Sequence, residues 1–253
     1  MDDLTHKSYD VAGSTNANAI VLLHGAAWSR KMWLPQMEAL ADEFRVIALD
    51  LPGHGELSST RFQLDDVVRE ITRVVNLEKK DRVMAVGLSM GGYAAMKVAQ
   101  SWPECVAGLV LSGATINYYG FVGSISKLAA TISLKLFGER RIQQMQEKSV
   151  RRMFPASVAE PNIQAGFSMK AIPDVFGEVA KFDSRSSLRS LRCPVLILNG
   201  EKDKQNRRGE SELVKQMTNA KLQIIENAGH ACNLDQPLAF AAAIRAFARE
   251  INW

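Results

Sequence analysis

The chain contains little cysteine and no hydrophobic run long enough to cross a membrane. Its three cysteines, Cys105, Cys193 and Cys232, are scattered and form no CxxC pair, so neither a disulfide framework nor a zinc site is expected. A spanning helix needs about 18 uninterrupted apolar residues, and the first residues lack the charged and then apolar profile of a signal peptide. We therefore expect a cytoplasmic protein with no metal site and no membrane partner.

A strong excess of charge of one sign is also missing. The chain has 31 Lys and Arg against 27 Asp and Glu, and the net charge is +4. Residues 113–185 carry the whole excess, with 10 basic and 6 acidic residues, while the rest of the chain has 21 of each. Basic pairs such as Arg140-Arg141 alternate with Gln and Glu, which indicates a solvated face. No basic run, aromatic stacking motif or zinc-finger spacing supports nucleic-acid binding.

Short runs rich in Val, Ile and Leu are abundant. They occupy residues 19–23, 45–49, 82–86, 107–111, 194–198 and 221–225, and a further short strand fits near residues 7–11. Runs that are continuous rather than alternating are typical of strands buried on both faces, as in a parallel sheet. Between them apolar residues recur at helical spacing, as in Leu64, Val67, Ile71 and Val74. This alternation predicts an α/β fold with a doubly wound, mostly parallel sheet of about seven strands.

The strand-helix alternation is interrupted between Gly113 and Cys193. Helical patterns are present at residues 125–136 and 141–153, with weaker ones at 158–169 and 175–181, and no run of the strand type occurs there. The segment is too long for a plain loop. We predict a helical lid formed by residues 113–185, inserted into one core domain formed by residues 1–112 and 186–253.

One serine lies among glycines where a predicted strand becomes a predicted helix. The stretch Gly87-Leu88-Ser89-Met90-Gly91 follows the run at 82–86 and precedes small residues of helical character. A G-x-S-x-G sequence in this context is typical of a nucleophile elbow, in which a strained turn exposes the serine hydroxyl. Ser89 is therefore the candidate nucleophile.

A serine nucleophile needs a base and a group that orients the base. Of the four histidines, His6 is near the N-terminus and His54 lies in a Gly/Pro-rich turn. His24 ends the first buried run, and we expect it to support the loop that follows. His230 follows the last predicted strand, and loops at the carboxyl ends of strands are where doubly wound sheets gather their sites. Asp203, after the run at 194–198, is the first candidate acid and Glu201 the second. The order Ser89, Asp203, His230 is the one expected with this elbow.

The remaining candidates concern the oxyanion and the substrate. The backbone N–H of Met90, at a helix start, and that of Ala26 or Ala27, after the first buried run, are the expected oxyanion donors. Trp28 and the lid residues Tyr118, Tyr119 and Phe121 are candidates for an apolar substrate pocket. The alternative is that these aromatic residues only pack helices together. Cys232, two residues after His230, has the same alternative, as a residue of the hydrophobic core.

These motifs together resemble the α/β-hydrolase superfamily over nearly the whole chain. The matching stretches are His24-Gly25, residues 50–56 (DLPGHGE), residues 87–92 (GLSMGG), residues 200–203 (GEKD), Gly229-His230 and residues 235–237 (DQP). Within that superfamily, GLSMGG and the compact size look most like carboxylesterases, enol-lactonases and haloperoxidase-like perhydrolases. The loop that contains Asp203 departs from the superfamily pattern. Relatives often carry a proline soon after the Asp, whereas this chain has Gln205-Asn206-Arg207.

The resemblance and the residues together predict a serine esterase. It would cleave esters of small to medium hydrophobic substrates through an acyl-enzyme, without a cofactor, as a monomer or a homodimer. Lactone opening, C–C bond hydrolysis and perhydrolysis with the same three residues are alternatives, because the shape of the lid decides between them. A non-catalytic ligand receptor on the same fold is an alternative of a different class.

Overall fold

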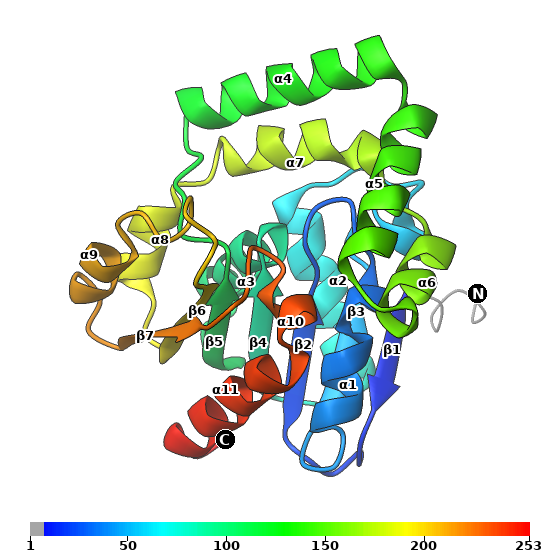
Figure 1. The fold of residues 1–253 in the computed structure, drawn as a ribbon. Coiled ribbons are helices and arrows are strands. Elements are labelled where there is room, and N and C mark those ends of the chain that lie inside the picture. The colour runs from blue at the N-terminus through cyan, green and yellow to red at the C-terminus, as the bar shows by residue number, and fades with distance from the viewer. Residues whose placement is uncertain (1–7) are drawn as a thin grey trace.

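A seven-stranded sheet forms the centre of the molecule in the computed structural model, which describes residues 8–253 (Figure 1). The strand order is β1-β3-β2-β4-β5-β6-β7. β1 pairs with β3 in antiparallel fashion, and all other neighbouring strands are parallel. The strands are β1 (Tyr9–Ala12), β2 (Ala19–Leu23), β3 (Arg45–Leu49), β4 (Val83–Leu88), β5 (Val106–Ser112), β6 (Val195–Gly200) and β7 (Ala220–Ile225). The prediction of a mostly parallel α/β sheet is confirmed.

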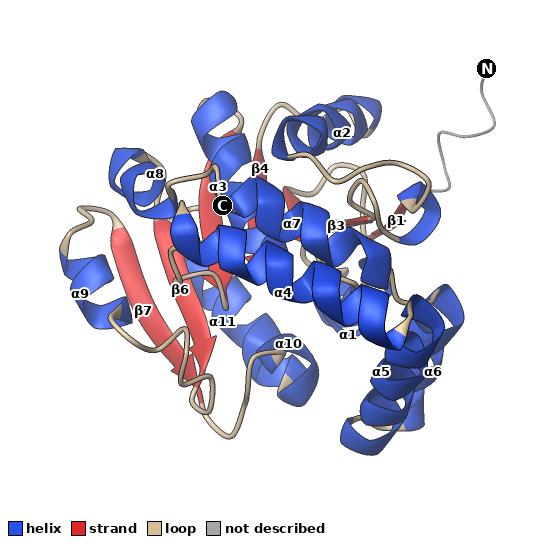
Figure 2. Ribbon diagram, turned by 90° about the horizontal axis from the view of Figure 1, so that it is seen from above, coloured by secondary structure: helices blue, strands red, loops and turns tan. Residues whose placement is uncertain are grey.

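Helices cover both faces of this sheet. The α-helices outside the β5–β6 connection are α1 (Leu34–Leu40), α2 (Leu64–Leu77), α3 (Met90–Ser101), α9 (Glu210–Lys215), α10 (Cys232–Asp235) and α11 (Pro237–Glu250), with short 3-10 helices η1 (Arg30–Trp33) and η2 (Gly55–Leu57). α1 and α11 lie on one face, and α2 and α3 lie on the other (Figures 1 and 2).

The strand side chains enter two separate cores. Along β2, Val21 and Leu23 belong to the core beneath α2 and α3, whereas Ile20 and Leu22 belong to the core beneath α1 and α11. All five residues of β2 are buried. Successive side chains of a strand point to opposite faces, so a strand covered on both sides requires an uninterrupted apolar run. This explains why the runs in the sequence located the central strands so well.

The connection from β5 to β6 is helical. It contains α4 (Phe121–Phe137), α5 (Glu139–Met153), α6 (Ala156–Ala165), η3 (Met169–Ala171), α7 (Ile172–Val179) and α8 (Ser184–Ser190). α4 and α7 lie side by side above the carboxyl ends of the strands, with α5 and α6 beyond one end of the pair (Figures 1 and 2). α8 instead packs against α3. We call residues 113–183 the insertion.

The expected helices of the insertion differ from the observed ones at their ends. The third helix was expected to reach residue 169, but α6 ends at Ala165, because Gly166 (φ +77°) takes a conformation that ends helices. The last one was expected at 175–181, and α7 begins earlier, at Ile172, with a proline in its first turn. The short helices α8, α9 and α10 have too few turns to give a periodic signal.

Two buried histidines support the loops that follow β2 and β3. The N–H of Leu51 donates to Nε2 of His24 at 3.0 Å, while Nδ1 of His24 lies 2.8 Å from the carbonyl of Gly25. His24 therefore accepts at one nitrogen and donates at the other, which only a neutral ring can do. His54 packs edge-on against it, with ring centroids 5.1 Å apart. Burial lowers the pKa of His24 to about 4 and that of His54 to about 3.

Because of these two histidines, we expect the folded protein to lose stability in mild acid. Both remain neutral in the folded state, while the unfolded chain binds a proton at each below a pH of about 6.5, so the free energy of unfolding falls as pH falls. Between pH 7 and pH 5 each histidine should reduce it by about 2 kcal/mol. Urea titrations at the two pH values measure this, and His54→Gln should show a smaller pH dependence than the wild-type protein. A wild-type stability that is equal at both pH values would contradict the assignment.

Candidate active site

Ser89 occupies a strained turn between β4 and α3. Its backbone has φ +54° and ψ −117°, a conformation that residues with a side chain rarely adopt. The N–H of Ser89 donates to the carbonyl of Ser112 at 2.7 Å, which ties the turn to the end of β5. α3 also approaches β2 very closely, because a Cβ on Gly91 would collide with the carbonyl of Leu23. These constraints present the partly exposed Ser89 at the carboxyl edge of the sheet.

His230 reaches this edge from a distant strand. It follows β7, and the chain from β7 crosses over the end of β6 before His230. The crossing requires a glycine, because a Cβ on Gly200 would collide with the carbonyl of Gly229. The N–H of Lys202 also donates to the carbonyl of Ala228 at 2.8 Å, and the N–H of Gly229 donates to Asp235 at 2.7 Å. The two residues before His230 are thus held in place, which fixes the position of its backbone.

Asp203 and His230 are joined directly. Oδ2 of Asp203 lies 2.7 Å from Nδ1 of His230, and the carboxylate is buried while about half of the imidazole side chain is exposed. Burial alone would raise the pKa of Asp203, but hydrogen bonds from His230 and from Asn206 lower it below its usual value. The carboxylate is therefore ionised at neutral pH and holds the ring through one nitrogen. Nε2 of His230 remains available for another partner.

The imidazole lies beside the strand end that holds Ser89. A Cβ on Gly113 would be 2.6 Å from Cε1 and 3.5 Å from Nε2 of His230, and Gly113 directly follows Ser112, whose carbonyl binds the N–H of Ser89. Within residues 8–253, no hydrogen bond joins the Ser89 hydroxyl to His230 in this conformation. The structure thus brings Asp203 and His230 into contact and places Ser89 on the neighbouring strand end.

The expected oxyanion donors lie at the ends of β2 and β4. Neither the N–H of Ala26 nor that of Met90 has a hydrogen-bond acceptor within residues 8–253. The loop after β2 is held in a turn by the N–H of Trp28, which donates to the carbonyl of Gly25 at 3.2 Å, and Ala27 has a positive φ of 68°. The N–H of Ser168 donates to the carbonyl of Ala27 at 2.9 Å, so the insertion contacts this loop directly.

A buried ion pair supports the same loop. Asp50 is fully buried and pairs with the guanidinium of Arg30, and it accepts the N–H of Arg30 at 2.8 Å and that of Glu56 at 3.0 Å. In the sequence, Asp50 was noted only as the first residue of the stretch at 50–56 that matches the superfamily. Its contacts show that it connects the loop after β2 to the loop after β3, a role for which Asp50 alone gave no local signal.

The predicted pocket residues fall into two groups. Trp28 packs edge-on against Phe167, with centroids 5.2 Å apart, and Tyr118 packs against Phe176 at 5.4 Å. Both side chains are partly buried between the core and the insertion. Tyr119 and Phe121 are instead 54% and 78% exposed. In this conformation they face solvent at the start of α4 and do not contribute to an enclosed pocket.

The two remaining residues considered in the sequence analysis are Cys232 and His6. Cys232 is buried, its Sγ lies 3.1 Å from the Ser112 hydroxyl, and burial raises the pKa of its thiol to about 11. It is therefore a packed thiol within the core beneath α11. His6 lies outside the described residues.

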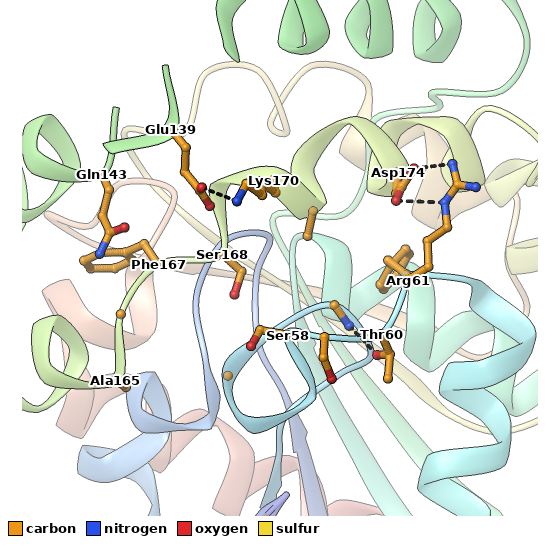
Figure 3. A pocket seen from close by; sticks show the side chains of 16 residues that line it. Ser58, Thr60, Arg61, Glu139, Gln143, Ala165, Phe167, Ser168, Lys170 and Asp174 are labelled. Atoms are coloured by element: carbon orange, nitrogen blue, oxygen red, sulfur yellow. Dashed lines mark hydrogen bonds and ion pairs between the residues drawn. The ribbon is translucent and has the colours of Figure 1, made fainter. Parts of the chain in front are cut away.

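A polar cavity of about 500 Å³ lies between the loop after β3 and the insertion (Figure 3). Its charged side chains pair with one another, Arg61 with Asp174 at 2.8 Å and Lys170 with Glu139 at 2.6 Å. Ser89, Asp203 and His230 are not among the residues that line it. The cavity thus presents neutralised ion pairs and none of the candidate catalytic groups.

Comparisons with known proteins agree with this architecture. The model of the alpha/beta hydrolase family matches residues 20–243. The chain belongs to the alpha/beta hydrolase family. It is 26% identical to the pimeloyl-[acyl-carrier protein] methyl ester esterase of Nitrosomonas europaea, over 94% of this chain and 99% of that protein. It is 25% identical to 3-oxoadipate enol-lactonase 1 of Acinetobacter baylyi, over 97% of this chain and 94% of the relative.

A solved structure is similar throughout. The thermophilic esterase from Thermogutta terrifontis superposes with a TM-score of 0.80 at 26% identity, covering 96% of this chain and 93% of that one. The superfamily resemblance derived from the motifs is therefore confirmed, and the protein is an alpha/beta hydrolase.

Asn206 belongs to the candidate site through its contacts with Asp203, and sequence reasoning did not assign it. Its side-chain amide donates to Oδ2 of Asp203 at 2.9 Å, and its backbone N–H donates to Oδ1 at 3.3 Å. Its Oδ1 accepts the N–H of Thr115, at the start of the insertion, at 3.1 Å. Asn206 lies in the stretch where relatives often have a proline, and that departure was the available signal.

Removal of the Asn206 side chain should destabilise the protein. Asn206→Ala leaves the buried N–H of Thr115 without a partner and removes the side-chain hydrogen bond to Asp203, which keeps His230 and the backbone N–H of residue 206 as partners. The free energy of unfolding should fall by about 1–3 kcal/mol. Urea denaturation at pH 7 measures the change. Gln205→Ala, at the exposed neighbouring position, is the control and should stay within about 0.5 kcal/mol of wild type. Equal stabilities for the two variants would show that the Asn206 contacts contribute nothing.

Proposed function

We propose that this hydrolase cleaves carboxylic esters of small to medium hydrophobic substrates, with Ser89 as nucleophile and an acyl-enzyme as intermediate. The observation that carries the proposal is the 2.7 Å contact between Asp203 and His230, next to a serine in a strained turn. A strained backbone is costly and is found mainly where function requires it. The alternative roles of these residues, in packing or loop bracing, require neither the strain at Ser89 nor a buried carboxylate on the ring.

The first half-reaction begins when an ester carbonyl carbon approaches the Ser89 hydroxyl. Nε2 of His230 takes the hydroxyl proton while the oxygen bonds to that carbon, and Asp203 stabilises the resulting imidazolium through Nδ1. Contacts of this kind are often loose without substrate and tighten in the substrate complex. The imidazolium then gives the proton to the leaving alkoxide, the carbon–oxygen bond breaks, and an alcohol departs.

The negative charge on the carbonyl oxygen needs donors in the transition state. The unpaired N–H groups of Ala26 and Met90 fill this role, and the start of α3 adds the positive end of a helix dipole. In the second half-reaction, His230 takes a proton from water, whose oxygen bonds to the acyl carbon. The bond from that carbon to Oγ of Ser89 then breaks, the imidazolium returns its proton to Oγ, and the acid departs. Asn206 acts on both steps by holding Asp203 in place.

Two observations support ester substrates: the aromatic side chains between the core and the insertion, and the names of the relatives. Aromatic side chains lie between the core and the insertion, among them the pairs Trp28–Phe167 and Tyr118–Phe176. Two relatives are named as a methyl ester esterase and an enol-lactonase, and a lactone is a cyclic ester. In this proposal the insertion acts as the lid that shapes the acyl pocket.

Turnover of p-nitrophenyl acetate and butyrate, followed by absorbance, tests the proposed function. The wild-type protein should hydrolyse these esters, and Ser89→Ala should reduce kcat by at least about 10⁴-fold, because no other described residue replaces the nucleophile. Ser59→Ala, at an exposed serine away from the triad candidates, should leave turnover unchanged. Negligible wild-type turnover, together with a ligand-induced rise in Tm, would instead favour the ligand-receptor alternative.

A further inference from the structure

The outer side of α4 is an exposed apolar stripe. We define the α4 face as Phe121, Val122, Ile125, Leu128, Ile132 and Leu136, all of which are exposed to solvent. Figures 1 and 2 show α4 outermost on the molecule, with α7 between it and the core. The exposed fraction is 78% for Phe121, 59% for Leu128 and 73% for Leu136. The stripe thus runs along the whole helix.

The opposite side of α4 already has its partner. A Cβ on Gly123 would be 2.6 Å from Cβ of Ala180, so the start of α4 packs tightly beside the end of α7. α4 and α7 make extensive contact along their length. The apolar stripe is therefore additional to the side that packs on the protein. Because α7 covers the inner side, the apolar outer side requires an apolar environment of its own, and contiguous exposed patches of this kind mark interaction sites.

The charges around the stripe have one sign. Residues 113–138 contain no Asp or Glu. Lys135, Arg140 and Arg141 are exposed, and none of them forms an ion pair within residues 8–253. Lys127 does not belong to this border, because its side chain extends over Gly177 of α7. Glu139, the first acid beyond α4, is neutralised by Lys170 at 2.6 Å. The α4 face is therefore apolar with a cationic border. Such a face complements a partner surface with an anionic outer layer and an apolar layer below it.

Size and charge disfavour a second copy of the chain as the occupant. Seventeen residues of helix are about 25 Å long, and a stripe roughly 10 Å wide would bury only about 250 Å² per partner, against about 800 Å² in a typical stable interface. A two-fold contact between two α4 faces would also bring the unpaired cations of both copies to the same border. A lipid surface requires neither a large area nor negative charge on the protein.

We propose that the α4 face docks onto the surface of an anionic phospholipid bilayer. The apolar side chains enter the boundary between headgroups and acyl chains, while Lys135, Arg140 and Arg141 remain at the anionic headgroups. This is contact with one leaflet: no single helix of the described chain is long and apolar enough to span a bilayer, and α4 with α5 meets that test only as a pair bent by 100°. The proposal departs from the expectation of no membrane partner, because the sequence did not reveal which side of α4 is exposed.

Flotation with vesicles tests the docking surface independently of hydrolysis. The full-length protein should float with vesicles of phosphatidylcholine containing 30% phosphatidylglycerol, and binding should fall in high salt and with pure phosphatidylcholine. Ile125→Gln/Leu128→Gln should weaken binding about tenfold. Arg140→Gln/Arg141→Gln should weaken it roughly fivefold per charge removed. The matched control is Leu238→Gln, at a residue on α11 that is 77% exposed, and it should bind like wild type.

Two further measurements make the outcomes distinct. Tm and turnover of a soluble ester should be the same in all variants, so that weaker binding reflects the surface and not the fold or the active site. Absence of binding to the anionic vesicles, or equal binding by the Ile125/Leu128 and Leu238 variants, would overturn the proposal. Sedimentation velocity supplies the other test: a wild-type dimer that Ile125→Gln/Leu128→Gln dissociates would assign the α4 face to a second copy instead.

Discussion

The hydrogen bond between Asp203 and His230 is the contact on which the site depends. It joins the loop after β6 to the loop after β7, and it exists only because the second loop crosses the end of β6 over Gly200. Asn206 fixes the carboxylate from the other side and links it to the first residues of the insertion. The orientation of one imidazole is thus determined by three neighbouring strands and by the way the insertion leaves the core.

The same sheet also maintains the strain at Ser89. A conformation of this kind costs about 1–3 kcal/mol and persists only where its surroundings impose it. Here the carbonyl of Ser112 holds the N–H of Ser89, while the buried strand β4 and the buried start of α3 fix the chain on either side. The two helix-covered cores therefore supply the rigidity that the turn requires. The insertion closes this arrangement from above through the contact of Ser168 with the loop at Ala27.

Much of the fold could be predicted from the sequence because the central strands are buried on both faces. The runs at 19–23 and 45–49 coincide with β2 and β3. Positions that depend on tertiary contacts were less predictable. The sequence of α4 does not reveal that its apolar stripe faces solvent. Phe121, at the start of α4, and Tyr119, just before it, were expected to line a pocket and are found in solvent. The short helices α8, α9 and α10 gave no periodicity.

The residues of the candidate site also divide into those that a local sequence signal indicated and those that depend on tertiary contacts. Ser89 was indicated by strand, glycines and helix together, and His230 and Asp203 by their positions after strands, all of which are local signals. The contributions of Asn206 and of the Arg30–Asp50 pair depend on contacts between residues that are distant in the chain or on the path of a loop. Polar residues in loops have many roles, and their neighbours in space decide which one applies.

The most direct test compares two substitutions in the acid loop. Asp203 contacts the imidazole, whereas Glu201 is exposed and accepts the N–H of Asn227 at 2.9 Å. If Asp203 orients His230, Asp203→Asn should lower kcat for a p-nitrophenyl ester by about 10³- to 10⁴-fold, while Glu201→Gln stays within about twofold of wild type. A large loss in Glu201→Gln with near wild-type turnover in Asp203→Asn would contradict the account.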